Sequence, residues 1–221
     1  MTQLSLPLGL RHSRVPPGFM VGARRLRRDG RLLAQVLSET RERSARHLVP
    51  VTALGLGLGA GRIRLDDLLM PWPTADIETR VQSFLDTAAA PYESADHRHL
   101  KLYGMLIALS IGAMRGGLEV SMCRGGTRLV PDVLAETAEH GLVAVEGGAS
   151  APDKVTALLA RGVDHVIVLP FRTLCQPALR GYVFRHRGTA PLPALGHVRA
   201  DCAARVDRVF TPASEVVHDV A

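Results

Sequence analysis

Cysteine is scarce in this chain of 221 residues, which contains only Cys123, Cys175 and Cys202. They are widely spaced and form neither a CxxC pair nor the even-numbered framework of a small secreted domain. Long hydrophobic runs are also missing, because the apolar stretch Leu102–Ala113 is shorter than the ~18 residues that a membrane span needs. The N-terminus lacks the charged region, apolar run and cleavage site of a signal peptide. We therefore expect a cytoplasmic globular protein.

Lysine and aromatic residues are rare as well. The 27 Lys and Arg residues comprise two lysines, Lys101 and Lys154, and 25 arginines, while aromatic residues make up 4% of the chain. The net charge of +6 raises the question of nucleic-acid binding. However, the densest cationic cluster, Arg24–Arg31, has no aromatic residue beside it on which a base would stack. The sequence alone therefore favours a solvated helix face over a nucleic-acid site.

Two regions are distinguishable along the chain. Residues Met1–Gly22 contain Pro7, Pro16 and Pro17 among scattered apolar residues, which predicts an extended N-terminal arm. We expect this arm to pack on a second copy of the chain, so that the protein is a homo-oligomer. Residues 23–221 are of a length that forms one domain with a sizeable core.

Strand and helix patterns in that domain predict an α/β fold. Leu142–Glu146 and His165–Phe171 are predicted strands, and the second is apolar and β-branched, as strands buried on both faces are. Ala151–Arg161 between them is a predicted helix, with Pro152 in its first turn and Gly162 at its end. A strand–helix–strand order with near-continuous apolar strands predicts a parallel sheet flanked by helices.

Other elements are less regular. We expect Asp66-Asp67 to open a helix and Leu100–Met114 to be a buried helix. Leu118–Cys123 and Gly181–Arg185 are strand candidates, and Leu129–Val133 is either a short strand or the start of a helix. The remaining expectations are a short helix or connector at Val133–His140 and a helix at Ala200–Val209.

A short motif in the arm offers one functional alternative. Gln3–Leu8 reads QLSLPL and is similar to the peptide by which several bacterial proteins dock on the DNA sliding clamp. Gln3, Leu4, Leu6 and Leu8 would carry the contact, with Leu6 and Leu8 entering an apolar pocket. In this alternative the protein is a non-enzymatic adaptor.

Three segments of the chain resemble a known enzyme family, the porphobilinogen synthases, which are also called 5-aminolevulinate dehydratases. These are Ala23–Val51 (ARRLRRDGRLLAQVLSETRERSARHLVPV), Gly59–Leu69 (GAGRIRLDDLL) and Val130–Gly148 (VPDVLAETAEHGLVAVEGG). The resemblance implies a parallel (β/α) barrel, here an incomplete TIM barrel, with chemistry at the carboxyl ends of its strands. It also implies a lyase of porphyrin biosynthesis with 5-aminolevulinate as substrate.

The departures from that family concern its chemistry. The segment that corresponds to its catalytic lysine, Ala194–Ala203, contains no lysine, and Arg199 cannot replace one because arginine stays protonated. The loop Leu134–Gly141 has none of the cysteines by which zinc-dependent members hold their metal. We therefore expect a divergent, shortened relative without the parent activity, a pseudoenzyme, and without zinc or another cofactor.

The resemblance also implies a remnant pocket for a small carboxylate. Its candidate residues are Asp132, Glu136, His140, Asp153 and Arg172.

Two further sets of residues leave alternatives open. Lys154 reads as a solvated helix lysine, whereas Lys101 between two leucines is a candidate for partial burial. His97 and His99, with Asp96, form a weak candidate for a metal site, for which a surface loop is the alternative reading.

Overall fold

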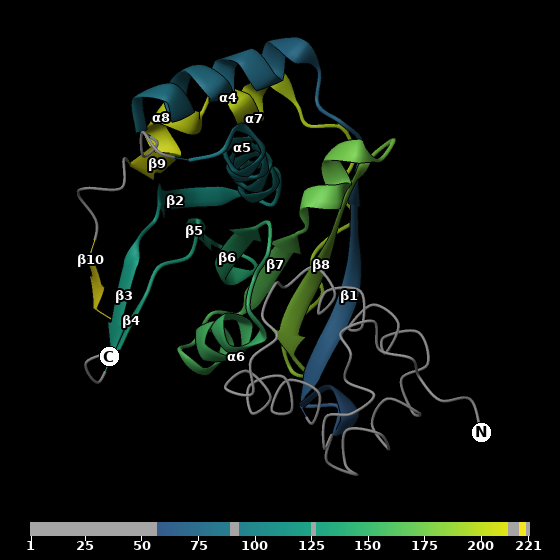
Figure 1. Ribbon diagram of the computed structural model, residues 1–221, viewed down its shortest axis with the longest axis vertical. Coiled ribbons are helices and arrows are strands. Elements are labelled where there is room, and N and C mark those ends of the chain that lie inside the picture. The colour runs from purple at the N-terminus through teal and green to yellow at the C-terminus, as the bar shows by residue number, and fades with distance from the viewer. Residues whose placement is uncertain (1–56, 89–92, 125–126, 212–216, 220–221) are drawn as a thin grey trace.

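The fold is described from a computed structural model of residues 57–88, 93–124, 127–211 and 217–219 (Figure 1). The strands are β1 (Ile63–Met70), β2 (Ala113–Leu118), β3 (Ser121–Arg124), β4 (Thr127–Leu129), β5 (Val133–Thr137), β6 (Gly141–Gly147), β7 (His165–Leu169), β8 (Leu179–His186), β9 (Phe210–Thr211) and β10 (Val217–Asp219). The helices are α4 (Ala75–Ala88), α5 (Ala95–Ser110), α6 (Pro152–Ala160), α7 (Ala200–Ala203), α8 (Val206–Val209) and the 3-10 helix η2 (Phe171–Cys175). The arm Met1–Gly22 and the segment Ala23–Val51 lie outside the described residues.

The main sheet is open and mixed. Its strand order is β1-β8-β7-β6-β5-β2-β9, in which the two-residue β9 only extends the edge. The pairs β1–β8, β8–β7, β6–β5 and β5–β2 are antiparallel, whereas β6–β7 and β2–β9 are parallel. The hairpin β3–β4 forms a second small sheet with β10.

The predicted parallel sheet and the incomplete TIM barrel are therefore both wrong, because most neighbouring strands are antiparallel. Parallel neighbours need a crossover connection, and among the long described strands only β6 and β7 are joined by one, through α6. Strand β5 turns directly into β6 at Gly141, whose φ of 66° suits a tight turn. Strand β8 returns antiparallel to β7 after the short η2. These two returns give an open sheet instead of a closed parallel one.

The prediction for the β6–α6–β7 unit is confirmed. Leu142–Glu146 lies within β6, His165–Phe171 begins with β7, and the two strands are parallel neighbours. Every residue of β7 is buried. Gly181–Arg185 likewise lies within β8, and most of Leu100–Met114 belongs to the buried helix α5.

Several other element predictions are wrong. Asp66-Asp67 lies in strand β1 instead of opening a helix, because β1 pairs with β8 along its whole length. Leu65 packs in the core on one face of the sheet, and Leu68 and Met70 pack in the core on the other. Asp66 accepts a hydrogen bond from Arg185 on β8. The stretch 133–140 contains strand β5. The candidate strand at 118–123 is divided between β2 and β3, and the predicted helix at 200–209 is divided into α7 and α8.

Helices cover both faces of the sheet. Figure 1 shows α4, α5, α7 and α8 together at the top of the view and α6 on the opposite side of the strands. In β7, Ile167 and Leu169 pack into the core under α5, whereas Val166 and Val168 pack into the core under α6. This alternation fixes which side chains at the strand ends face which helix. No helix in the described ranges combines the length and apolar character needed to cross a membrane.

A core substitution tests the packing of α5. Leu106 is 0% exposed, so Leu106→Ala should lower the free energy of unfolding by about 2–5 kcal/mol, measured by urea denaturation. Met114 is 51% exposed, and Met114→Ala should change the same quantity by less than about 0.5 kcal/mol. Equal effects of the two variants would contradict the described core.

Candidate functional site

Charged side chains gather at one edge of the sheet, where neighbouring strands begin or end. Strand β5 runs opposite to β2 and β6, so its start lies beside their carboxyl ends. Val133 pairs with Val145, and continuing that register places Asp132 opposite Glu146. A hydrogen bond of 2.6 Å from the Gly147 N–H to Asp132 Oδ2 fixes this arrangement. Two carboxylates from adjacent strands therefore face the same edge.

Glu146 is the more buried of the two carboxylates. Its side chain is 3% exposed, and its Oε2 lies 2.6 Å from Lys154 Nζ in the first turn of α6. Burial and the nearby charge of Asp132 raise the pKa of Glu146 to about 8, against the lowering effect of Lys154. The loss of hydration thus outweighs the ion pair that the 2.6 Å contact provides.

Asp132 is held in its charged form. Burial raises its pKa, but the hydrogen bond from His97 and the charge of Lys154 outweigh burial, so the net pKa is lowered. His97 Nε2 lies 3.1 Å from Asp132 Oδ2, and the same bond raises the pKa of His97 against the effect of burial. His97 lies in the first turn of α5, where Ser94 caps the helix by accepting the His97 N–H. The helix start therefore positions the imidazole against the sheet edge.

Lys101 forms a second ion group one turn along α5. The residue is 2% exposed, and its ammonium donates to Glu93 and to Glu119. Burial lowers the pKa of Lys101, but these two carboxylates outweigh burial and raise it. Glu119 follows β2 with φ 52°, a conformation that non-glycine residues rarely adopt. Such backbone strain is frequent at functional sites.

Two carboxylate oxygens in this cluster have no hydrogen-bond partner among the described residues. They are Glu146 Oε1 and Glu93 Oε2, and both atoms are buried. A buried oxygen without a donor is costly unless a ligand or ion supplies the missing contact. At Glu146 this agrees with the raised pKa, because a buried carboxyl that lacks a donor favours its protonated form, and a bound cation would have to displace that proton.

Only some of the residues predicted from the sequence meet at this edge. Asp132 lies at its centre, and Asp153 is next to Lys154 at the start of α6. Glu136 binds Arg115 toward the other end of β5, and His140 lies in the turn beyond that end. The structure therefore does not bring Glu136 and His140 to the edge where Asp132 lies, and Arg172 lines the pocket described below.

The structure shows the burial and the partners of the two lysines and of the His97–His99 motif. The predicted burial of Lys101 is confirmed. Lys154 is not a purely solvated lysine, because it pairs with a buried carboxylate. His97 turns to Asp132 while His99 is exposed, and among the described residues no three His, Cys, Asp or Glu side chains converge on a metal position.

Sequence reasoning missed Glu146, Glu119 and Glu93 as members of the site. For Glu146 the signal was present, since a single charged residue ends an otherwise apolar strand and precedes two glycines. No comparable local signal marks Glu119 or Glu93.

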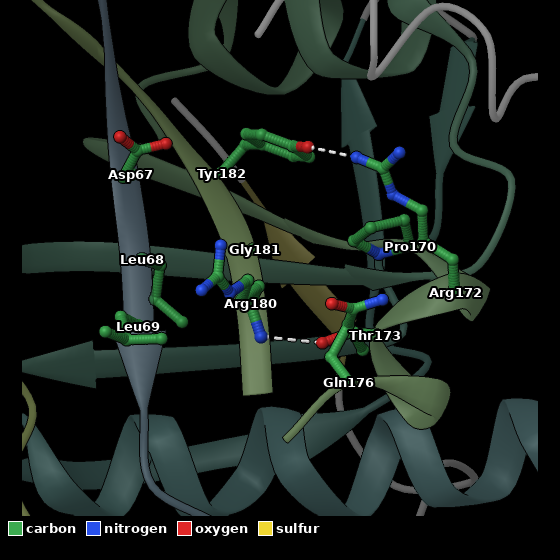
Figure 2. Close-up of a pocket in the computed structure, with 10 residues that line it drawn as sticks. All are labelled: Asp67, Leu68, Leu69, Pro170, Arg172, Thr173, Gln176, Arg180, Gly181 and Tyr182. Atoms are coloured by element: carbon green, nitrogen blue, oxygen red, sulfur yellow. Dashed lines mark hydrogen bonds between the residues drawn. The ribbon is translucent and has the colours of Figure 1, made fainter. Parts of the chain in front are cut away.

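A pocket of about 560 Å³ lies farther along the same edge (Figure 2). It is formed by the end of β1, the start of β8 and η2, and its lining residues are Asp67, Leu68, Leu69, Pro170, Arg172, Thr173, Gln176, Arg180, Gly181 and Tyr182. Arg172 donates to the Tyr182 hydroxyl at 2.6 Å, and the Arg180 N–H donates to the Thr173 hydroxyl at 2.6 Å.

Comparison with known proteins gave no match. No family model, no curated protein and no solved structure matches this chain. The site is therefore interpreted from its own geometry.

The Lys101 ion group has a testable effect on stability. Lys101→Met should lower the free energy of unfolding by about 3–5 kcal/mol, because it leaves Glu93 and Glu119 close together without their shared cation. Urea denaturation measures the loss. The double variant Lys101→Met with Glu119→Gln should recover part of it, and a single variant as stable as the wild type would contradict this account.

The raised pKa of Glu146 predicts a pH dependence of stability. The ordinary pKa of 4.5 applies in the unfolded chain, and the folded pKa is about 8, so between these values the folded protein holds a proton that the unfolded chain has lost. Stability should therefore fall as the pH rises through this window, with a slope from this group of up to about 1.4 kcal/mol per pH unit.

The variant Glu146→Gln isolates this contribution. Unfolding measured in the presence of EDTA from pH 5 to pH 8 should give a flatter profile for Glu146→Gln than for the wild type. Glu136→Gln, which changes an exposed carboxylate of β5, should keep the wild-type slope. Parallel profiles for the wild type and Glu146→Gln would show that Glu146 is ionised in the folded protein.

Proposed function

We propose that this protein is a divalent-cation-dependent phosphodiesterase acting on nucleic acid, with the cation bound by Asp132 and Glu146. The observation that carries the proposal is the pair of carboxylates at the start of β5 and the end of β6, in which the buried Glu146 Oε1 has no donor among the described residues. Carboxylate oxygens are the ligands that Mg²⁺ prefers. Mg²⁺ typically takes one or two carboxylates and completes its shell with waters and substrate phosphates, so a third protein ligand is not required.

The surrounding side chains suit the same reaction. His97 orients Asp132 through its hydrogen bond, as partners of metal ligands commonly do. The Lys154 ammonium beside Glu146 is placed to stabilise negative charge on the phosphate oxygens. Lys101, by contrast, is enclosed by Glu93 and Glu119 and has a structural role.

The reaction is a hydrolysis that needs only water as co-reactant. The oxygen of one water forms a bond to phosphorus while the bond from phosphorus to one ester oxygen breaks. The attacking water gives its proton to solvent, and the departing oxygen takes a proton from a second water. Asp132 and Glu146 would hold the Mg²⁺, which would neutralise charge on the phosphate and lower the pKa of the attacking water.

Nucleic acid as substrate revises the expectation drawn from composition. That expectation rested on Arg24–Arg31, which lies outside the described residues. The carboxylate pair supports a phosphodiester substrate without reference to that arginine cluster. The net charge of +6 also favours a polyanionic substrate. The predicted cytoplasmic location is compatible with this proposal.

Cleavage assays test the proposed function. The purified chain should cleave labelled DNA or RNA oligonucleotides in Mg²⁺, and EDTA should abolish cleavage. Asp132→Asn and Glu146→Gln should each lower the rate by about 10²-fold or more, because each removes a ligand of the cation. Gel electrophoresis of the products measures the rate.

A matched control separates loss of the site from loss of one charge. Glu136→Gln removes a carboxylate from the same strand β5 but toward its other end, and should cleave like the wild type. Failure of the wild type to cleave either nucleic acid in Mg²⁺ or Mn²⁺ would overturn the proposal. So would full activity of Asp132→Asn.

The tetrapyrrole hypothesis stays a prediction, and its structural premise, the barrel, is wrong. A Schiff base needs a neutral amine, whereas Lys101 has a raised pKa between two carboxylates and Lys154 is paired with Glu146. These contacts support the expected lack of porphobilinogen synthase activity. The sliding-clamp alternative through Gln3–Leu8 concerns residues outside those described.

A further inference from the structure

A single row of residues across the sheet joins the carboxylate pair to the pocket. Glu146 of β6 pairs with Val168 of β7, Val168 pairs with Tyr182 of β8, and Tyr182 pairs with Asp67 of β1. Residues in one row lie on one face, and Val168 and Tyr182 belong to the core under α6. Lys154 of α6 contacts Glu146 on that same face. The pocket therefore lies at the same edge of the sheet as Glu146, two strand spacings or about 10 Å away, with the buried Val168 between them.

The pocket differs from the carboxylate pair in charge. Arg172 and Arg180 contribute two cations to its lining against the single carboxylate of Asp67. Tyr182 fixes the Arg172 guanidinium through a hydrogen bond of 2.6 Å, and Figure 2 shows the Arg172 side chain extended toward the tyrosine ring. A guanidinium held in this way is suited to bind phosphate, because its planar N–H groups match the oxygens of the anion.

The wall of the pocket also has an apolar part. Leu69 is 54% exposed, an unusual position for leucine, and it lies with Leu68 and Pro170 in the same lining. A ligand that joins a phosphate to an apolar ring matches both parts of the wall. A nucleotide unit has this composition, and a free inorganic anion does not.

The junction between the carboxylate edge and the pocket is closely packed. Gly148 follows Glu146 and Gly147 with φ 82°, and its N–H donates to Leu169 O at 2.8 Å. A Cβ at this position would lie 2.4 Å from Phe171 Cζ at the start of η2. The carboxylate edge and the helix that carries Arg172 are therefore in direct contact.

We propose that Arg172 and Arg180 form a subsite that binds a backbone phosphate of the nucleic-acid strand, beside the phosphate that is cleaved at Asp132 and Glu146. This inference rests on the proposed function for the identity of the strand. The binding step itself needs neither the cation nor cleavage. It is therefore measurable when the reaction is blocked.

The test is binding of a fluorescent single-stranded or duplex DNA oligonucleotide in EDTA, followed by anisotropy over a range of salt concentrations. Arg172→Gln should weaken binding about tenfold, and its plot of log affinity against log salt should lose about one unit of slope. Arg180→Gln, at an exposed position where folding is not at risk, should act in the same direction. Arg172→Lys should recover only part of the loss, because it keeps the charge without the planar fork.

The matched control is Arg187→Gln. Arg187 is exposed just beyond the far end of β8 and does not line the pocket, so binding should change by less than about twofold. Wild-type affinity in both Arg172→Gln and Arg180→Gln would overturn the subsite, as would an equal loss in Arg187→Gln.

The outcomes for subsite and reaction are separable. Cleavage that depends on Asp132, together with wild-type binding by the arginine variants, overturns the subsite and leaves the proposed function intact. Arginine-dependent DNA binding without cleavage supports the subsite and overturns the phosphodiesterase. An absence of DNA binding by the wild-type chain overturns both.

Discussion

The desolvation of Glu146 is the constraint around which the charged edge of this sheet is organised. Strand β6 lies inside the sheet between β5 and β7, both faces of the sheet are covered by core side chains and helices, and Glu146 near its end is buried. A carboxylate in that position loses its hydration and needs compensating charge. Lys154 supplies an ammonium on one side, while Asp132 adds repulsion on the other. The hydrogen bonds that Asp132 accepts from His97 and from the Gly147 N–H hold its carboxylate in place and so limit its repulsion of Glu146.

The two helices that flank β6 provide that support from opposite faces. Helix α5 presents His97 from its first turn to Asp132, and α6 presents Lys154 from its first turn to Glu146. Gly147 allows the close approach of α5, since a Cβ there would lie 2.9 Å from Leu100 Cβ. Both helices thus begin at the edge where the carboxylates lie, with α5 packed on β6 and α6 on β7, and this packing determines the distances within the site. A shift of either helix would leave a buried charge uncompensated, which is far more costly than losing an exposed ion pair.

The parts of the fold that were predictable from the sequence are those with local signals. Strand β7 is apolar throughout and α6 has a proline in its first turn, so both were found. The direction of β8 was not predictable, because it depends on η2 reversing the chain and no residue pattern distinguishes that from a crossover. The sequence predicts a helix or connector where β5 lies, because Leu134, Ala135 and Glu136 favour helices intrinsically. Pairing with β2 and β6 overrides that preference.

The pairing register of the strands explains why only some of the site residues were predictable from the sequence. Asp132 and His140 are close in sequence, yet strand β5 separates them toward opposite edges of the sheet. Asp132 and Glu146 are farther apart in sequence and lie opposite one another because β5 and β6 are antiparallel. The same register carries the row on through Val168 to Tyr182, which holds Arg172. Along that row the charge changes from two carboxylates to a fixed guanidinium across one buried valine. The carboxylates would need a cation to accept a polyanion and the arginine would not, and this difference is why we propose cleavage at one end of the row and phosphate binding at the other.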